Sequence, residues 1–157
     1  MPEVSPIPQG HGTLTPHITL TNAADAIEFY KKAFGAKELT RLPGPKGLVM
    51  HAALDFGGSI LMLCDEFPGS ETNRAPKNLG GTTATMHIWT DDVDALFERA
   101  VKAGARVEMS VRDMFWGDRY ATLYDPFGHK WGLAQRIANL TSEQMLKNAA
   151  EVFSNWE

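Results

Sequence analysis

The chain has 157 residues, 43% of them hydrophobic, and a formal net charge of −4. This length holds one domain, or two half-domains sharing a core, and no basic excess favours nucleic acid or membrane as a partner. The chain has one cysteine, Cys64, and its N-terminus lacks the basic-then-apolar pattern of a secretion signal. Both features are typical of a cytoplasmic protein. No apolar run approaches the roughly 18 residues of a membrane span. We therefore expect a small-molecule partner.

One sequence pattern occurs twice, 70 residues apart. His17-Ile-Thr recurs as His87-Ile-Trp (87 − 17 = 70), and Asp55-Phe-Gly-Gly-Ser recurs without a gap as Asp125-Pro-Phe-Gly-His (125 − 55 = 70). A repeat of this length predicts a duplicated structural unit, with a site expected between its halves.

Residues 1–12 are proline-rich and predict a flexible leader, and residues 13–66 predict the first unit. Alternating polar and apolar residues at 14–20 indicate a strand, and an amphipathic helix follows between Asn22 and Gly35. Turn residues then separate three further short strands, near 37–42, 48–56 and 59–65. The order of this unit is therefore βαβββ.

Residues 67–82 are rich in turn-forming residues and predict a linker, after which 83–136 repeat the βαβββ order. Residues 137–157 predict a C-terminal helix, because Thr141 and Gln144 have the spacing of a capping box. This helix packs either on its own subunit or on a partner subunit. Its predicted apolar side consists of Met145, Ala149, Val152, Phe153 and Trp156.

Two segments carry a resemblance to a known family. Ile-Glu-Phe-Tyr-Lys-Lys-Ala-Phe-Gly-Ala at 27–36 and Asp-Pro-Phe-Gly-His-Lys-Trp at 125–131 resemble the vicinal oxygen chelate (VOC) superfamily of glyoxalases, bleomycin-resistance proteins and extradiol dioxygenases. The resemblance covers about residues 13–136. The segments Leu-Thr-Pro-His at 14–17 and Phe-Trp-Gly-Asp-Arg at 115–119 are similar to the glyoxalase-like group associated with phosphonate-utilisation genes. The resemblance to the superfamily implies an α+β fold in which two curved βαβββ sheets pair around a cleft. It also implies a homodimer.

In such a fold, strand alternation directs one set of side chains into the cleft. The set on the first strands is Thr15, His17, Thr85, His87 and Trp89. The segment 114–120 adds Trp116, Asp118 and Arg119, and Arg119 is a candidate for bidentate binding of an anion. The alternative is that Asp118 and Arg119 only stabilise the hairpin.

Glyoxalase I members hold a metal ion with a histidine on each module's first strand and a glutamate on its last. The matching positions here are Thr15, Thr85, Leu63 and Leu133, which supply neither imidazole nor carboxylate. We therefore expect no cofactor and no usual metal site. The alternative is a shifted divalent-metal site formed by His17, His87 and Asp65.

The sequence thus predicts a VOC protein that binds a small organic ligand in the cleft between its modules. The second hypothesis is an enzyme, a glyoxalase-like lyase or another metal-assisted isomerase or transferase, using the shifted metal site. A third is an interaction protein that engages another chain through its C-terminal helix. No catalytic residue is assigned by the sequence.

Overall fold

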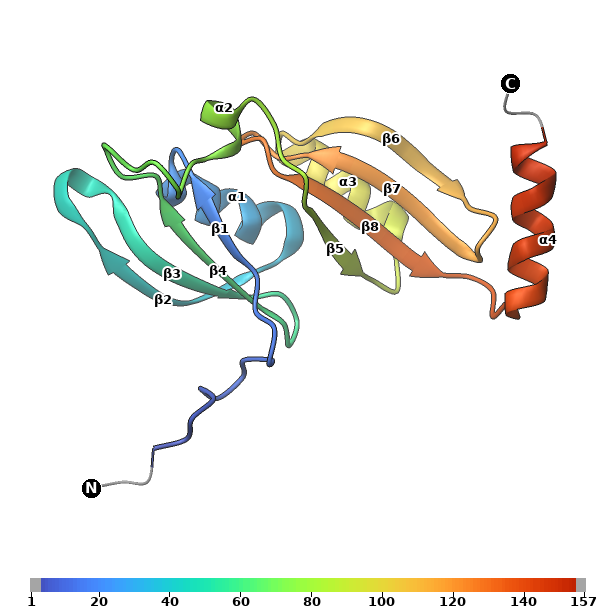
Figure 1. Ribbon diagram of the computed structural model, residues 1–157, viewed down its shortest axis with the longest axis horizontal. Coiled ribbons are helices and arrows are strands. Elements are labelled where there is room, and N and C mark those ends of the chain that lie inside the picture. The colour runs from blue at the N-terminus through green and yellow to red at the C-terminus, as the bar shows by residue number, and fades with distance from the viewer. Residues whose placement is uncertain (1–3, 155–157) are drawn as a thin grey trace. The chain divides into compact units, whose positions relative to one another are not determined.

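The computed structural model describes residues 4–154, and these form two compact units (Figure 1). Module 1 is the chain up to Thr82 together with Pro126–Gly128, and module 2 is Thr83–Asp125 with the chain from His129 onward. Each module contains one four-stranded sheet and one covering helix. The predicted α+β class and the repeated βαβββ order are therefore confirmed.

In module 1 the strand order is β1-β4-β3-β2, with β1 and β4 parallel and the other pairs antiparallel. A short 3₁₀ turn, Pro45–Gly47, follows β2, and a one-turn helix, α2, follows the sheet. The elements are β1 (His17–Leu20), α1 (Ala23–Phe34), β2 (Lys37–Pro43), β3 (Val49–Asp55), β4 (Ile60–Asp65) and α2 (Pro76–Leu79).

Helix α1 begins and ends where the sequence places its caps. The Asn22 side chain accepts a hydrogen bond from the Asp25 backbone N–H, and Gly35 ends the helix in the left-handed conformation. The helix lies across one face of the sheet (Figure 1). The fully buried side chains of this module include Leu20, Ile27, Tyr30, Leu54 and Leu63.

In module 2 the strand order is β5-β8-β7-β6, the same arrangement as in module 1, again with a parallel pair, β5 and β8. Asp92 caps the covering helix and Gly104 ends it. The elements are β5 (Thr85–Trp89), α3 (Val93–Ala103), β6 (Arg106–Asp113), β7 (Asp118–Tyr124), β8 (Lys130–Arg136) and α4 (Ser142–Phe153).

Each sheet therefore has one face covered by its helix and a second face, here called the open face. The open face of module 1 carries His17 and Thr19 on β1, because their neighbours Ile18 and Leu20 are buried toward α1. The open face of module 2 carries Thr85, His87 and Trp89 on β5. The registers add the residues paired with them on the neighbouring strands, which are Met62 and Cys64 in module 1 and Gly132, Tyr120 and Thr122 in module 2.

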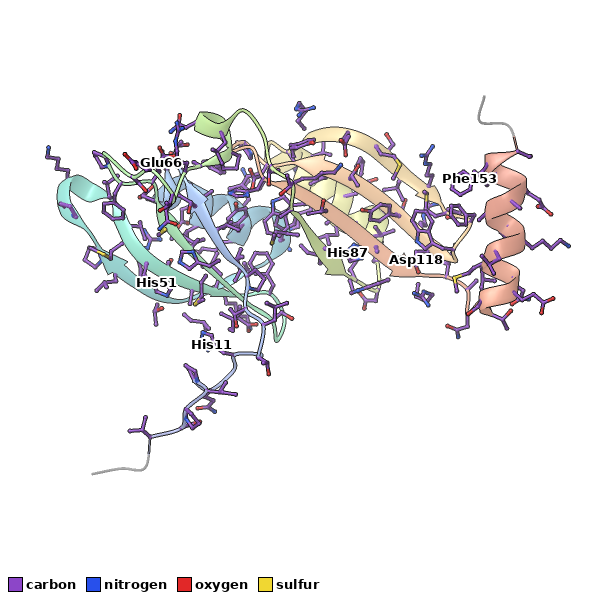
Figure 2. The ribbon with its side chains drawn as sticks, viewed as in Figure 1. His11, His51, Glu66, His87, Asp118 and Phe153 are labelled. Carbon is purple, nitrogen blue, oxygen red and sulfur yellow. The ribbon has the colours of Figure 1, made fainter. Side chains whose placement is uncertain are left out.

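Helix α4 begins with the predicted capping box, in which Thr141 and Gln144 exchange side-chain to backbone hydrogen bonds. None of its described residues is buried. It contacts the β6–β7 loop through the Asn148 amide, which donates to the Phe115 carbonyl at 3.1 Å, and through Phe153 (Figure 2). Trp156, also predicted for this helix, lies outside the described residues.

No helix within residues 4–154 combines the length and the apolar character that crossing a lipid bilayer requires.

Candidate functional site

A continuous row of aromatic rings crosses the open face of module 2. The ring of Trp116 is 5.9 Å from that of Tyr120, which stacks on His87 at 5.7 Å with an interplanar angle of 18°. His87 lies 4.8 Å from Trp89. These rings come from the β6–β7 loop, from β7 and from β5, so only the folded sheet brings them together. They offer a planar ligand several faces to pack against.

Gly132 is the residue that lets Tyr120 approach His87. A Cβ at this position on β8 would lie 2.6 Å from the Tyr120 hydroxyl oxygen, 3.0 Å from its Cε2 and 3.2 Å from His87 Nδ1. Every other residue has a Cβ, so any substitution would push the Tyr120 ring off the strand. The aromatic row therefore depends on a glycine at this position.

A cavity of about 470 Å³ opens beside this row and lies wholly within module 2. Small-molecule sites are often of this size, with apolar walls and a few polar groups. Its polar end contains a hydrogen-bonded ion pair. The lining residues are Thr85, Glu108, Met109, Met114, Trp116, Tyr120, Thr122 and Lys130.

The ion pair joins Glu108 to Lys130, with an Nζ to Oε2 distance of 2.6 Å, and the Thr122 hydroxyl donates to the same carboxylate at 2.8 Å. Glu108 stands between two register positions where the pairing of β6 with β7 slips, at Val107 and Met109. The hydrogen bond from Lys130 is the main cause that lowers the pKa of the Glu108 carboxyl, and the Thr122 bond adds to it. The lowered pKa and the ion pair with Lys130 make the Glu108 carboxylate a weak general base.

Partial burial of the His87 ring favours its neutral form. Burial is the main cause that lowers the pKa of its imidazole below the usual 6.5, and the nearby Asp118 carboxylate opposes this shift. A neutral imidazole beside Tyr120 and Trp89 presents an aromatic face and one hydrogen-bond acceptor to a ligand.

Arg119 lies on the opposite face of β7 from Tyr120. Its guanidinium donates to both oxygens of Asp94 on α3, at 2.7 and 2.8 Å, and to Asp113 at 2.9 Å. These hydrogen bonds raise the pKa of Arg119, and the hydrogen bonding to Asp94 contributes most. The structure therefore supports the hairpin-stabilising alternative for Arg119 and does not bring it to the open face.

Asp118 does lie on the open face, because it is two residues from Tyr120 on β7 and pairs in register with Arg136 on β8. Its side chain is nevertheless buried, at 4% exposed. Its carboxylate accepts a hydrogen bond from the Arg136 Nε. The Arg136 guanidinium also lies 5.5 Å above the centre of the Trp89 ring. Trp89 and Arg136 line a second cavity, of about 510 Å³, together with Thr90, Asp91 and Gln135.

The open face of module 1 has a different character. His17 stacks on His51 at 5.9 Å, and Thr19 Oγ1 lies 4.0 Å from Cys64 Sγ. Burial, followed by the neighbouring His51, lowers the pKa of His17, and burial raises the pKa of the Cys64 thiol. The cysteine is therefore protonated and unreactive at neutral pH. Thr15 precedes β1 and donates its hydroxyl to the Gly12 carbonyl at 3.1 Å.

Two residues of the shifted metal hypothesis, Asp65 and His17, lie on opposite faces of the module 1 sheet. Asp65 pairs in register with Leu20 on the helix-covered face, whereas His17 lies on the open face of the same sheet. Both Asp65 oxygens accept backbone N–H groups, from Ala23 at 2.8 Å and Val49 at 2.7 Å. Residues 4–154 contain no group of three or more His, Cys, Asp or Glu side chains placed to hold an ion. We therefore leave Asp65 out of the candidate site.

The structure also changes which last-strand residues correspond to the metal-binding glutamates of glyoxalase I. Leu63 and Leu133 are fully buried on the helix-covered faces, so the glutamate equivalents on the open faces are neighbouring residues. None of these is a carboxylate: they are Met62, Cys64, Gly132 and Ala134.

Sequence reasoning missed Gly132, Glu108, Lys130 and Arg136, and it included Tyr120 only as the end of the segment 114–120 without assigning it a role. Strand alternation from Asp118 would have placed Tyr120 on the same face, and alternation along β8 would have grouped Gly132 with Lys130 and Arg136. Nothing in the sequence indicated Glu108, because the slipped register of β6 directs it.

Comparison with known proteins agrees with this fold. Residues 13–133 match the Glyoxalase/Bleomycin resistance protein/Dioxygenase superfamily. An uncharacterized protein of Mycobacterium bovis is 46% identical over 134 residues, which is 84% of this chain and 88% of that protein.

Two solved structures are similar to this chain. TioX from Micromonospora sp. ML1 has a TM-score of 0.65 and 28% identity, over 80% of this chain and 99% of its own. TnmS3, an antibiotic binding protein from Streptomyces sp. CB03234, has a TM-score of 0.60 and 27% identity, over 78% of this chain and 93% of its own. With the superfamily match covering most of its length, the chain belongs to the Glyoxalase/Bleomycin resistance protein/Dioxygenase superfamily.

Proposed function

We propose that this protein binds a small, planar, aromatic organic molecule on the open face of module 2, without a metal ion of the glyoxalase kind. The row of Trp116, Tyr120, His87 and Trp89 beside a cavity of about 470 Å³ is the observation that carries the proposal. Stacking on such rings adds about 0.5–1.5 kcal/mol per pair beyond the burial of apolar area.

The family relationship supports a binding role. TnmS3, which shares the fold at 27% identity, is an antibiotic binding protein. A binding protein needs an apolar wall and a few fixed polar groups, and it needs no general base or Lewis acid.

The metal-assisted enzyme is the weaker hypothesis, because Asp65 is committed to two backbone N–H groups. The carboxylates on the open face of module 2 are also paired, Asp118 with Arg136 and Glu108 with Lys130. Neither is available to move a proton while those pairs persist.

Four further expectations stay predictions. The resemblance implies that the open face of module 1 completes the ligand cleft and that the protein is a homodimer. The single cysteine and the net charge of −4 favour a cytoplasmic protein with no nucleic-acid partner.

Calorimetric titration with naphthamide, a neutral planar probe, tests the proposal. We expect binding to the wild-type protein, weakened about tenfold in Trp116→Ala and in Tyr120→Leu, since each loses one ring of the row. Phe153→Ala is the matched control, because Phe153 is an aromatic residue of α4 that contacts Phe115.

We expect the Phe153→Ala protein to bind naphthamide as the wild type does. Failure of the wild-type protein to bind naphthamide, or equal affinity in all four proteins, would contradict the proposal.

A further inference from the structure

Arg136 is held in one orientation by two neighbours on the open face of module 2. The buried Asp118 carboxylate accepts from Nε, and the Trp89 ring lies 5.5 Å beneath the guanidinium carbon. A guanidinium fixed at one edge and stacked on a ring has lost most of its rotational freedom before any ligand arrives.

The opposite edge of this guanidinium remains available. The Arg136 side chain is 53% exposed, and its two terminal nitrogens donate to no other residue within the described range 4–154. Arg119 differs, because all three of its guanidinium nitrogens donate to carboxylates, two to Asp94 and one to Asp113. Of the two arginines, Arg136 is the one with a free pair of parallel donors.

The aromatic row leads to this edge. Trp89 is the last ring of the row, 4.8 Å from His87, and it carries Arg136 on its face. A planar ligand stacked along the row would therefore bring a substituent to the terminal nitrogens of Arg136. The cavity there has a volume of about 510 Å³ and leaves room for such a group.

We propose that Arg136 binds a carboxylate group carried by the aromatic ligand, through two parallel N–H···O bonds. The inference rests on the proposed function and names its substrate class as aromatic carboxylates. Asp118 already balances the charge of Arg136, and Asp91 lines the same cavity. Selectivity therefore comes mainly from geometry: a carboxylate offers two acceptor oxygens to the fork, whereas a carboxamide offers one.

The test compares naphthoate with naphthamide, which share one ring system, by calorimetric titration. We expect the wild-type protein to prefer naphthoate about tenfold. In Arg136→Gln this preference disappears while the affinity for naphthamide changes little. Arg136→Lys keeps the charge without the planar fork, so most of the preference should be lost.

Two further proteins control for indirect effects. Arg119→Gln removes an arginine from the other face of β7 and should keep the full preference for naphthoate. Arg136→Gln leaves Asp118 buried without its partner, so the double variant Asp118→Asn/Arg136→Gln repeats the measurement without that charge. It should bind both probes alike.

The outcomes separate the two proposals. Equal wild-type affinity for both probes, or a preference that survives in Arg136→Gln and in the double variant, overturns the role of Arg136 and leaves the aromatic site standing. Failure of the wild-type protein to bind naphthamide overturns the proposed function and this inference with it.

Discussion

Asp65 and Gln135 occupy the same position in the two modules, 70 residues apart (135 − 65 = 70), and do the same structural work. The Asp65 carboxylate accepts from the first N–H of α1, at Ala23, and the Gln135 side-chain oxygen accepts from the first N–H of α3, at Val93. The distances are 2.8 and 3.2 Å. Each residue ties the last strand of its sheet to the start of the covering helix, so both are structural residues.

Replacement of Asp65 should therefore destabilise the fold. Asp65→Ala leaves the buried backbone N–H groups of Ala23 and Val49 without acceptors, and we expect the free energy of unfolding to fall by about 3 kcal/mol. Gln135→Ala removes one neutral hydrogen bond and should cost about 1 kcal/mol. Urea unfolding measures both.

The same measurement in EDTA distinguishes this role from metal binding. A structural Asp65 gives the same loss with and without chelator, whereas a metal ligand would give a loss that the chelator removes. A chelator-dependent loss would restore the metal hypothesis.

Gly132→Ala should disturb the aromatic row. Its new Cβ would meet the Tyr120 hydroxyl oxygen at 2.6 Å and His87 Nδ1 at 3.2 Å, so the Tyr120 ring must move. We expect a loss of about 1–3 kcal/mol in the free energy of unfolding, typical of overpacking, and weaker naphthamide binding.

A double-mutant cycle with Tyr120→Leu checks the cause of that loss. Because leucine lacks the ring that clashes, Gly132→Ala should cost much less in the Tyr120→Leu background. Additive losses would show that Tyr120 is not the residue displaced.

Stability should fall as the pH falls through the titration range of His87. Burial lowers the pKa of this imidazole in the folded chain below its ordinary 6.5, so the unfolded chain takes up a proton that the folded chain lacks. The contribution is fully present above about pH 7.5 and is lost as the pH decreases toward the folded pKa. His17, whose pKa is lowered in the same direction, adds to the effect.

The free energy of unfolding measured between about pH 7.5 and about pH 5 checks this. His87→Gln should show a shallower decrease than the wild-type protein, and the double variant with His17→Gln a shallower one still. Parallel profiles for all three proteins would contradict the assignment.

Removal of residues 141–157 should leave module 2 folded. Helix α4 has no buried residue among those described, and its contacts with the rest of module 2 include the Asn148 hydrogen bond to Phe115 and the Phe153 ring. We expect little change in the urea midpoint and in the far-ultraviolet spectrum beyond the lost helix. Sedimentation of the shortened protein tests in addition whether the helix joins two subunits. A decrease in the number of subunits, relative to the full-length protein, would assign it that role.

The sequence by itself determined the repeated βαβββ order, the two helices and their caps, and the division of β1 and β5 into two faces. These features follow from local chemistry, because turn residues, capping side chains and the alternation of apolar residues act within a few positions of the chain. The open-face positions of His17, His87 and Trp89 were predictable for this reason.

Only the tertiary structure showed which charged groups are paired with one another and which reach the open face. Arg119 and Arg136 look alike in the sequence, yet Arg119 donates to Asp94 and Asp113 while Arg136 is held by Asp118 against Trp89. Strand register and the slip in β6 set these partners, and neither leaves a mark in local composition. A hydrogen bond between residues distant in sequence depends on where the folded backbone brings them, so only the packed sheet could distinguish an arginine with two carboxylate partners from one with free terminal nitrogens.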